Sequence, residues 1–244
     1  MSLTDKIKLI ECPRDAMQGL HDFIPTEKKI RYINSLLKVG FDTLDFGSFV
    51  SPKAIPQLAD TKEVLSKLEL ENSQTKLLAI VANERGGIEA AELKEIQYLG
   101  FPFSISEIFQ KRNTNSSIEE SLLLVARLLE ICEESNKELV VYVSMGFGNP
   151  YGEPWNVEIV QNWCAKLAGL GVKILSLSDT IGTSNPESIS HLFSNLIPAF
   201  PAIEFGAHGG TNFSKLELLR SKPEKHESLL PLTKIGHTAS EMVE

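Results

Sequence analysis

The chain has 244 residues, of which 42% are hydrophobic and 23% charged, a composition typical of a globular protein with a sizeable core. Its 24 lysines and arginines stand against 32 aspartates and glutamates, and the resulting net charge of −8 offers no basic surface for nucleic acid. No apolar run approaches the roughly 20 residues that span a bilayer, and the N-terminus lacks the apolar stretch of a secretion signal. We therefore expect neither nucleic acid nor a membrane as a partner.

Three cysteines, Cys12, Cys132 and Cys164, are far apart in the chain. Their number is odd and no two share a CxxC spacing, so the sequence predicts neither a disulfide framework nor a structural zinc site. A reducing cytoplasm is the expected location.

Strands and helices alternate along the chain. A short apolar run at 7–12 predicts a strand, and after a loop a helix runs from Thr26, an expected N-cap, to Gly40. A strand at 43–46 and a helix at 54–70, interrupted early by Pro56, follow. The next two units have strands at 76–83 and 98–104, with a helix at 87–96 between them and a long helix, capped by Ser117, after them. The remaining strands are expected at 139–144, 172–178 and 203–207, and the remaining helices at 157–170 and 186–200.

Strands that are apolar throughout, rather than alternating, are typical of a parallel sheet covered on both faces. Seven such strands joined by helices predict a (β/α)8 TIM barrel or a doubly wound sheet. The barrel is favoured because no GxGxxG turn follows the first strand and because polar residues follow nearly every strand: Asp15, Ser48, Asn83, Ser106, Ser144, Asp179 and His208. The chain has no linker or low-complexity tract, so we expect one domain over 1–244, with a last βα unit that is atypical or incomplete.

A guanidinium and a carboxylate stand side by side directly after the first strand, at Arg14 and Asp15, with Gln18 close behind. Such a carboxylate can bind a hard divalent cation while the arginine stabilises a developing oxyanion. A purely structural Arg/Asp pair is the competing interpretation. His208, at the end of the seventh strand, could add an imidazole ligand, although a lone histidine is more often a hydrogen-bonded core residue.

Five stretches, in this order, resemble the 3-hydroxy-3-methylglutaryl-CoA lyase family of metal-dependent, aldolase-type TIM-barrel lyases. They are ECPRDAMQ at 11–18, DFGSFVSPK at 45–53, NTNSSIEES at 113–121, GFGNPY at 146–151 and LSDTIG at 177–182. The resemblance runs from about residue 7 to 208. The PRD tripeptide is shared across the superfamily, whereas the SFVSPK and SIEES stretches point to the lyase branch.

The resemblance implies cleavage of 3-hydroxy-3-methylglutaryl-CoA into acetyl-CoA and acetoacetate with Mg²⁺ or Mn²⁺, by a protein that commonly forms a homodimer. It implies these site residues: Arg14, Asp15 and Asp45 as catalytic groups, Asp15 and His208 as metal ligands, and Gln18, Ser48, Asp179 and Thr180 at the substrate. Asp45 stands where the family has a glutamate. Ser48 and Thr180 could instead cap the helices that follow, and Lys53 is expected to be a solvated lysine rather than a contact for a CoA phosphate.

The chain departs from the family pattern after His208. The family's second metal histidine is expected two residues later, where this sequence has Gly210, and 209–244 contains neither a cysteine nor a GxGGCP loop. A helix at 214–234 and a strand at 232–235 could complete a barrel. Two alternatives therefore stay open beside the lyase: a related acyl-CoA lyase or synthase, and a degenerate homologue that only binds a CoA thioester or a partner.

Overall fold

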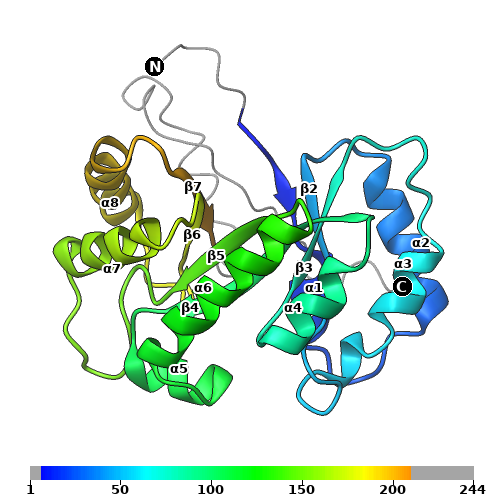
Figure 1. The fold of residues 1–244 in the computed structure, drawn as a ribbon, viewed down its shortest axis with the longest axis horizontal. Coiled ribbons are helices and arrows are strands. Elements are labelled where there is room, and N and C mark those ends of the chain that lie inside the picture. Colours follow the sequence, from blue (N-terminus) through cyan, green and yellow to red (C-terminus); the bar gives the residue numbers. More distant parts are fainter. Residues whose placement is uncertain (1–6, 210–244) are drawn as a thin grey trace. The chain divides into compact units, whose positions relative to one another are not determined.

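A computed structural model describes residues 7–209, which form two compact units (Figure 1). The first, here the N-terminal unit, comprises residues 8–101 and 130–139. The second, the C-terminal unit, comprises Ile7, 102–129 and 140–209. The expected helix at 214–234 and strand at 232–235 lie outside the described residues. The expectation of a single domain over 1–244 stays a prediction.

Parallel strands in chain order form the sheet of the N-terminal unit. They are β1 (Ile10–Glu11), β2 (Thr43–Ser48), β3 (Lys76–Ile80) and β4 (Ile96–Ser104), whose last three residues belong to the C-terminal unit. Leu44, Leu78 and Leu99 on these strands have no solvent exposure. Apolar side chains on consecutive strands therefore build the core that fixes the polar residues at the strand ends.

Helices of the N-terminal unit differ from the expected ones at several places: a helix follows the first strand directly, the helix expected at 54–70 is a 3-10 turn and a short helix, and the helix expected at 87–96 lies at 84–91. They are α1 (Pro13–Gln18), α2 (Thr26–Leu37), the 3-10 turn η1 (Pro56–Leu58), α3 (Thr61–Ser66) and α4 (Glu84–Ala91). The expected loop after the first strand is wrong, because Pro13 occupies the first turn of α1 and its fixed φ favours a helix start. The expected N-cap at Thr26 is also wrong. Thr26 is already helical, and its hydroxyl donates to Asp60 Oδ2 at 2.8 Å.

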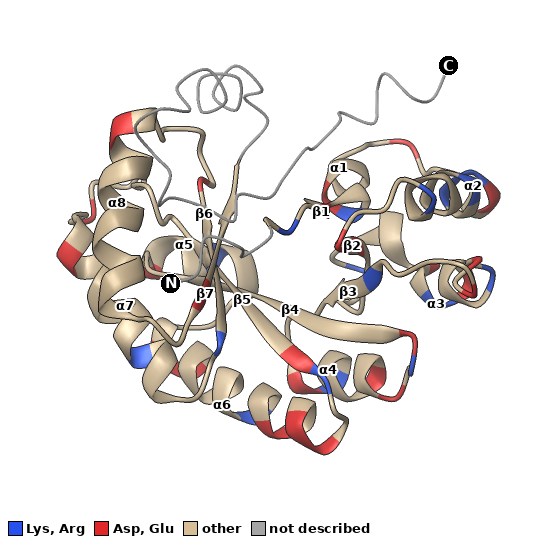
Figure 2. Ribbon diagram, turned by 90° about the horizontal axis from the view of Figure 1, so that it is seen from above, with Lys and Arg blue, Asp and Glu red and all other residues tan. Residues whose placement is uncertain are grey.

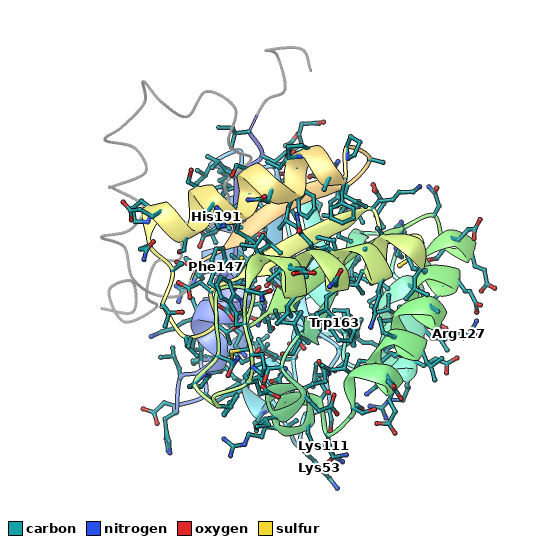
Figure 3. All side chains as sticks on the ribbon, turned by 90° about the vertical axis from the view of Figure 1, so that its left-hand side faces the viewer. Lys53, Lys111, Arg127, Phe147, Trp163 and His191 are labelled. Carbon is teal, nitrogen blue, oxygen red and sulfur yellow. The ribbon has the colours of Figure 1, made fainter. Side chains whose placement is uncertain are left out.

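Three further parallel strands form the sheet of the C-terminal unit: β5 (Glu138–Ser144), β6 (Ile174–Ser178) and β7 (Glu204–His208). The first two residues of β5 belong to the N-terminal unit. The helices α5 (Glu107–Thr114), α7 (Val157–Gly169) and α8 (Pro186–Ala199) belong to this unit, and α6 (Ile118–Glu134) begins in it. Trp163 of α7, labelled in Figure 3, packs its ring 5.7 Å from that of Phe103 at the end of β4.

Capping explains where the longest helix begins. Ser117 Oγ accepts the backbone N–H of Glu120, and the Glu120 carboxylate accepts the N–H of Ser117 at 2.7 Å, which is a reciprocal capping box. The predicted start of this helix is therefore confirmed. Figure 2 shows acidic residues at both ends of α6. Across residues 7–209, no helix is both long and apolar enough to cross a bilayer.

Candidate active site

Arg14 is the centre of a polar cluster in the N-terminal unit. It lies in the first turn of α1, where it is 7% exposed. Its Nε lies 3.1 Å from each carboxylate oxygen of Asp45, and its Nη2 donates to Asp45 Oδ2 at 2.5 Å. Its Nη1 donates to Asp15 Oδ1 at 3.1 Å and to Gln18 Oε1 at 2.9 Å. Three other side chains singled out from the sequence thus meet around the guanidinium of Arg14.

The two carboxylates of this cluster differ in exposure. The Asp45 side chain is fully buried, whereas 42% of the Asp15 side chain is exposed. Burial by itself lowers the pKa of Arg14, but the charge and hydrogen bonds of Asp45, followed by the charge of Asp15, outweigh it and raise that pKa. Arg14 therefore stays a cation although it is buried.

Strand β2 places Asp45 beside α1. Asp45 pairs with Leu78 of β3, and the register then shifts before Gly47, so β2 bulges directly after the aspartate. Gly47 leaves no room for a side chain, since a Cβ there would lie 2.5 Å from Thr61 Cγ2 of α3. Helix α3 therefore packs closely against β2 at Gly47, the residue next to the bulge.

Ser48 ends β2 and is only 3% exposed. Its Oγ accepts the N–H of Val50 at 3.2 Å, and its own N–H donates to Thr61 Oγ1 at 3.1 Å. The hydroxyl shapes the turn after the strand rather than capping a helix. Lys53, farther along this turn, is exposed, and Figure 3 shows it at the edge of the molecule.

Asp179 is the corresponding buried carboxylate of the C-terminal unit. It directly follows β6 and is 4% exposed. Its Oδ1 accepts the N–H of Thr183 at 2.8 Å, and its Oδ2 accepts the N–H and the hydroxyl of Ser184 at 3.1 and 2.5 Å. Its carboxylate therefore folds the loop that leads into α8.

Thr180 and His208 lie beside Asp179. Thr180 Oγ1 accepts the N–H of Met145, a residue with the rare φ of +61° at the end of β5. His208 ends β7, its backbone oxygen accepts the N–H of Asp179 at 2.9 Å, and its imidazole packs edge-on against Tyr142 at 5.2 Å. The ends of β5, β6 and β7 are thus joined within one unit.

Sequence reasoning missed the partner of Ser106. This residue, 2% exposed, caps α5 and donates from its hydroxyl to Glu153, whose Oε1 accepts the N–H of Ile108 at 3.3 Å. Lys111, labelled in Figure 3, donates to the Asn115 oxygen at the other end of α5. The expected polar residue after β3, Asn83, likewise caps a helix through Gly86 N–H. Loop carboxylates such as Glu153 carry no periodic signal, so only the fold could reveal this contact.

The predicted site residues fall into two groups. Arg14, Asp15, Gln18, Asp45 and Ser48 belong to the N-terminal unit, whereas Asp179, Thr180 and His208 belong to the C-terminal unit. A metal shared by Asp15 and His208 stays a prediction. Within the part of the chain that the structure describes, no group of three or more His, Cys, Asp or Glu side chains could hold a cation.

Known proteins resemble both the sequence and the fold. The sequence pattern of the HMGL-like family matches residues 6–214. A hydroxymethylglutaryl-CoA lyase of Bacillus subtilis is 34% identical over 196 residues, which cover 80% of this chain and 65% of that protein. The crystal structure of the HMG-CoA lyase from Bacillus subtilis has a TM-score of 0.83 at 29% identity and covers 96% of this chain and 77% of that one. An HMG-CoA lyase from Acinetobacter baumannii, solved with coenzyme A and 3-methylmalate, has a TM-score of 0.77 at 26% identity, covering 85% and 67%.

These similarities show that the chain is a TIM-barrel protein of the lyase type. The alternation of strands and helices predicted the barrel, and the motifs indicated the lyase type. The chain belongs to the HMGL-like family. The resemblance drawn from five short motifs is thereby confirmed. The chain spans somewhat less than two thirds of the length of the curated relatives that it matches, 62–65% for three of them.

Proposed function

We propose that this protein is a divalent-metal-dependent carbon–carbon lyase that cleaves 3-hydroxy-3-methylglutaryl-CoA into acetyl-CoA and acetoacetate. The observation that carries the proposal is the cluster of Arg14, Asp15 and Asp45 at the end of β1, in a chain of the HMGL-like family. A buried, permanently charged guanidinium beside an exposed carboxylate provides both an oxyanion donor and a base.

The reaction makes four demands on the chain. The tertiary hydroxyl must lose its proton, the carbon–carbon bond must break, the thioester enolate that leaves must be stabilised, and that enolate must finally gain a proton to give acetyl-CoA. A carboxylate of the cluster, Asp15 or Asp45, accepts the hydroxyl proton. The Arg14 guanidinium donates to the enolate oxygen, where a fixed positive charge favours the developing negative charge.

Asp15 and His208 are the proposed metal ligands. An exposed carboxylate and an imidazole are donors that Mg²⁺ or Mn²⁺ accepts, and these ions keep several waters when few protein ligands are present. The donor types therefore fit such an ion. When bound, the metal would polarise the substrate hydroxyl and carboxylate.

The remaining site residues are proposed to orient the acyl-CoA. Gln18 lies one turn after Arg14 and already accepts a hydrogen bond from it, so its carboxamide is held in the cluster. Ser48, Asp179 and Thr180 end strands or begin the loops after them, the place where TIM barrels bind their substrates. The coenzyme A in the Acinetobacter baumannii relative supports an acyl-CoA as the ligand.

The test is acetoacetate formation from 3-hydroxy-3-methylglutaryl-CoA by the purified chain with Mg²⁺ or Mn²⁺ and a reducing agent, with calorimetric binding of the same thioester in parallel. We expect binding together with turnover, and turnover at least about 10²-fold lower in Arg14→Gln. Binding without turnover would instead support a non-catalytic homologue. The absence of both would contradict the proposal.

The metal assignment has its own measurement. Asp15→Asn is expected to weaken Mn²⁺ binding measured by calorimetry, because it removes one negative oxygen ligand. Asp42→Asn is the matched control, since Asp42 precedes β2, away from the cluster, and accepts only from the neighbouring Thr43 hydroxyl in the described side-chain contacts. Equal Mn²⁺ affinity in the two variants would exclude Asp15 as a ligand.

A further inference from the structure

A buried glutamine joins two connecting segments of the N-terminal unit. The first segment runs from β1 to α2 and includes α1, and the second runs from β2 to α3 and includes η1. Gln57 of η1 is 5% exposed, and its Oε1 accepts the N–H of Ile24 at 2.8 Å. Its Nε2 donates to the backbone oxygens of Asp22 at 2.8 Å and Leu20 at 3.4 Å. One carboxamide of the second segment therefore binds the loop at 19–25 through its backbone.

A buried ion pair holds this glutamine from the side of α2. The Lys29 side chain is 1% exposed, and its ammonium donates to the backbone oxygen of Gln57 and, at 2.7 Å, to Asp60 Oδ1. The other carboxylate oxygen of Asp60 accepts the Thr26 hydroxyl. The Lys29 ammonium also lies 4.0 Å from the ring centre of Phe23, in the loop that Gln57 binds. Lys29, Gln57 and Asp60 thus form one connected cluster, here the loop anchor.

Both members of the ion pair are placed against the local preferences of their helices. Asp60 stands at the N-cap of α3, yet in the described contacts its side chain accepts no N–H of that helix, although such a cap stabilises a helix start. Lys29 lies in the first turn of α2, where the helix macrodipole disfavours a cation. Local conflicts of this kind are expected where a functional site imposes its own geometry. They indicate that the loop anchor serves the two connecting segments rather than the two helices.

The loop anchor acts on the segment that carries the proposed site. Leu20, whose oxygen Gln57 binds, donates its own N–H to the Met17 oxygen of α1 at 3.0 Å. In the same short helix Gln18 accepts a hydrogen bond from Arg14, and α1 lies against η1. Both connecting segments leave the C-terminal ends of parallel strands, where TIM barrels bind their substrates. A loosened loop would let α1 shift, and a shift of about 1 Å at a catalytic group can cost about 10²-fold in rate.

We propose that Gln57 is a positioning residue for the lyase reaction, and that Lys29 and Asp60 hold it in place. Because its carboxamide is bound to the loop at 19–25, Gln57 acts on the reaction by fixing that loop and, through it, α1 with Arg14. This inference rests on the proposed lyase function. It adds three residues that lie outside the five family motifs.

The test compares Gln57→Leu with Gln97→Leu. Gln97 is the matched control, because its Oε1 accepts the N–H of Leu77 on a neighbouring strand at 2.8 Å, but at the N-terminal ends of β3 and β4. The measurements are kcat for 3-hydroxy-3-methylglutaryl-CoA and its dissociation constant by calorimetry. Gln57→Leu should lower kcat about 10- to 10²-fold and change the dissociation constant less than about 3-fold, since every site residue is present but misplaced. Gln97→Leu should leave kcat within about 2-fold of wild type.

Hydrogen exchange of residues 13–25, measured by mass spectrometry, gives a readout that does not depend on activity. Gln57→Leu removes the acceptor of the Ile24 N–H, so exchange in this segment should be at least about 10-fold faster than in wild type and in Gln97→Leu. If Gln57→Leu does not fold, Gln57→Glu takes its place. It keeps the acceptor for Ile24 but sets a second oxygen against the backbone oxygens of Asp22 and Leu20, and it should change exchange and kcat in the same direction.

Unchanged exchange in residues 13–25 would overturn the inference, whatever the activity of the chain. An equal loss of kcat in Gln97→Leu would also overturn it, because the effect would then follow from lost stability anywhere in the unit. A wild-type chain that neither binds nor cleaves the thioester, while the Gln57 variant still exchanges faster, would overturn the lyase function and leave only the structural link between the two segments.

Discussion

Each of the two units buries one carboxylate at its candidate site, and the two are stabilised in different ways. Asp45 of the N-terminal unit lies against the guanidinium of Arg14, 31 positions away in the sequence. Asp179 of the C-terminal unit accepts hydrogen bonds from two peptide N–H groups and one hydroxyl, all within five residues of it. Asp45 thus takes part in an ion pair between residues far apart in the sequence, whereas Asp179 accepts hydrogen bonds from the loop that directly follows it.

The difference extends beyond these two residues. A second buried ion pair in the N-terminal unit joins Lys29, 1% exposed, to Asp60 at 2.7 Å, with the Lys29 ammonium 4.0 Å from the ring centre of Phe23. Removing one partner of a buried ion pair leaves a buried charge without compensation, whereas removing Asp179 leaves the N–H groups and the hydroxyl of its own loop without their acceptor. The N-terminal unit should therefore be the more sensitive to single charge deletions.

The largest effect is expected for Asp45→Ala. It leaves the Arg14 cation buried, so the free energy of unfolding should fall by about 3–5 kcal/mol in urea titration. Asp42→Ala serves as the control on the same segment and should cost less than about 1 kcal/mol. A loss below about 1 kcal/mol for Asp45→Ala would show that water reaches the guanidinium and would remove the contrast between the units.

Asp179→Ala should cost less, about 2–3 kcal/mol, because it leaves three neutral donors without their acceptor. Ser184→Ala, which removes only the hydroxyl contact, should cost about 1 kcal/mol. The same urea titration measures both. An equal loss of unfolding free energy in Asp179→Ala and Asp45→Ala would contradict the expected difference in stability between the two carboxylate sites.

Alkaline pH tests one thiol in each unit. Burial raises the pKa of Cys164 from 9.0 to about 12, and burial, opposed by Lys137 and aided by Glu138, does the same for Cys132. Between pH 9 and 12 the unfolded thiols are ionised and the folded ones are not, so stability falls as the pH rises. Each thiol should contribute about 1.4 kcal/mol per pH unit in this window.

Cysteine variants separate the two contributions. Cys164→Ala and Cys132→Ala should each reduce the slope of unfolding free energy against pH, measured by urea titration between pH 9 and 11, by about the same amount, because both folded pKa values are about 12. A slope that neither substitution changes would mean that both thiols ionise in the folded protein.

The smallest effect is expected at the start of α6. Ser117→Ala removes the side-chain cap and should lower the free energy of unfolding by about 1 kcal/mol, whereas Ser117→Asp should retain most of it. The hydrogen bonds from the Ser117 backbone and side chain lower the pKa of Glu120, so the alanine variant should also move that pKa toward its ordinary value. An unchanged Glu120 titration by NMR would contradict this account of the cap.

Elements with strong local signals were predictable. The helix capped by Ser117 and the strands with continuous apolar runs lie where the sequence placed them, because caps and apolar runs act within a few residues. The helix directly after β1 was not predictable from the sequence. Helix α1 has only six residues and no apolar periodicity, and its residue Arg14 contacts Asp45 of β2. Helix α5, with its Ser106 cap bound by Glu153, was missed for the same reason.

The sequence by itself determined the residue types of the site, since Arg14, Asp15 and Gln18 follow the first strand and Asp179 and His208 follow later ones. Tertiary structure decided which groups pair. The tripeptide suggests that Arg14 pairs with its neighbour Asp15, yet its bidentate partner is Asp45 on the adjacent strand. The physical reason is that the parallel pairing of β1 with β2 brings residues about thirty positions apart into contact, away from water, where a full guanidinium–carboxylate pair is most strongly favoured.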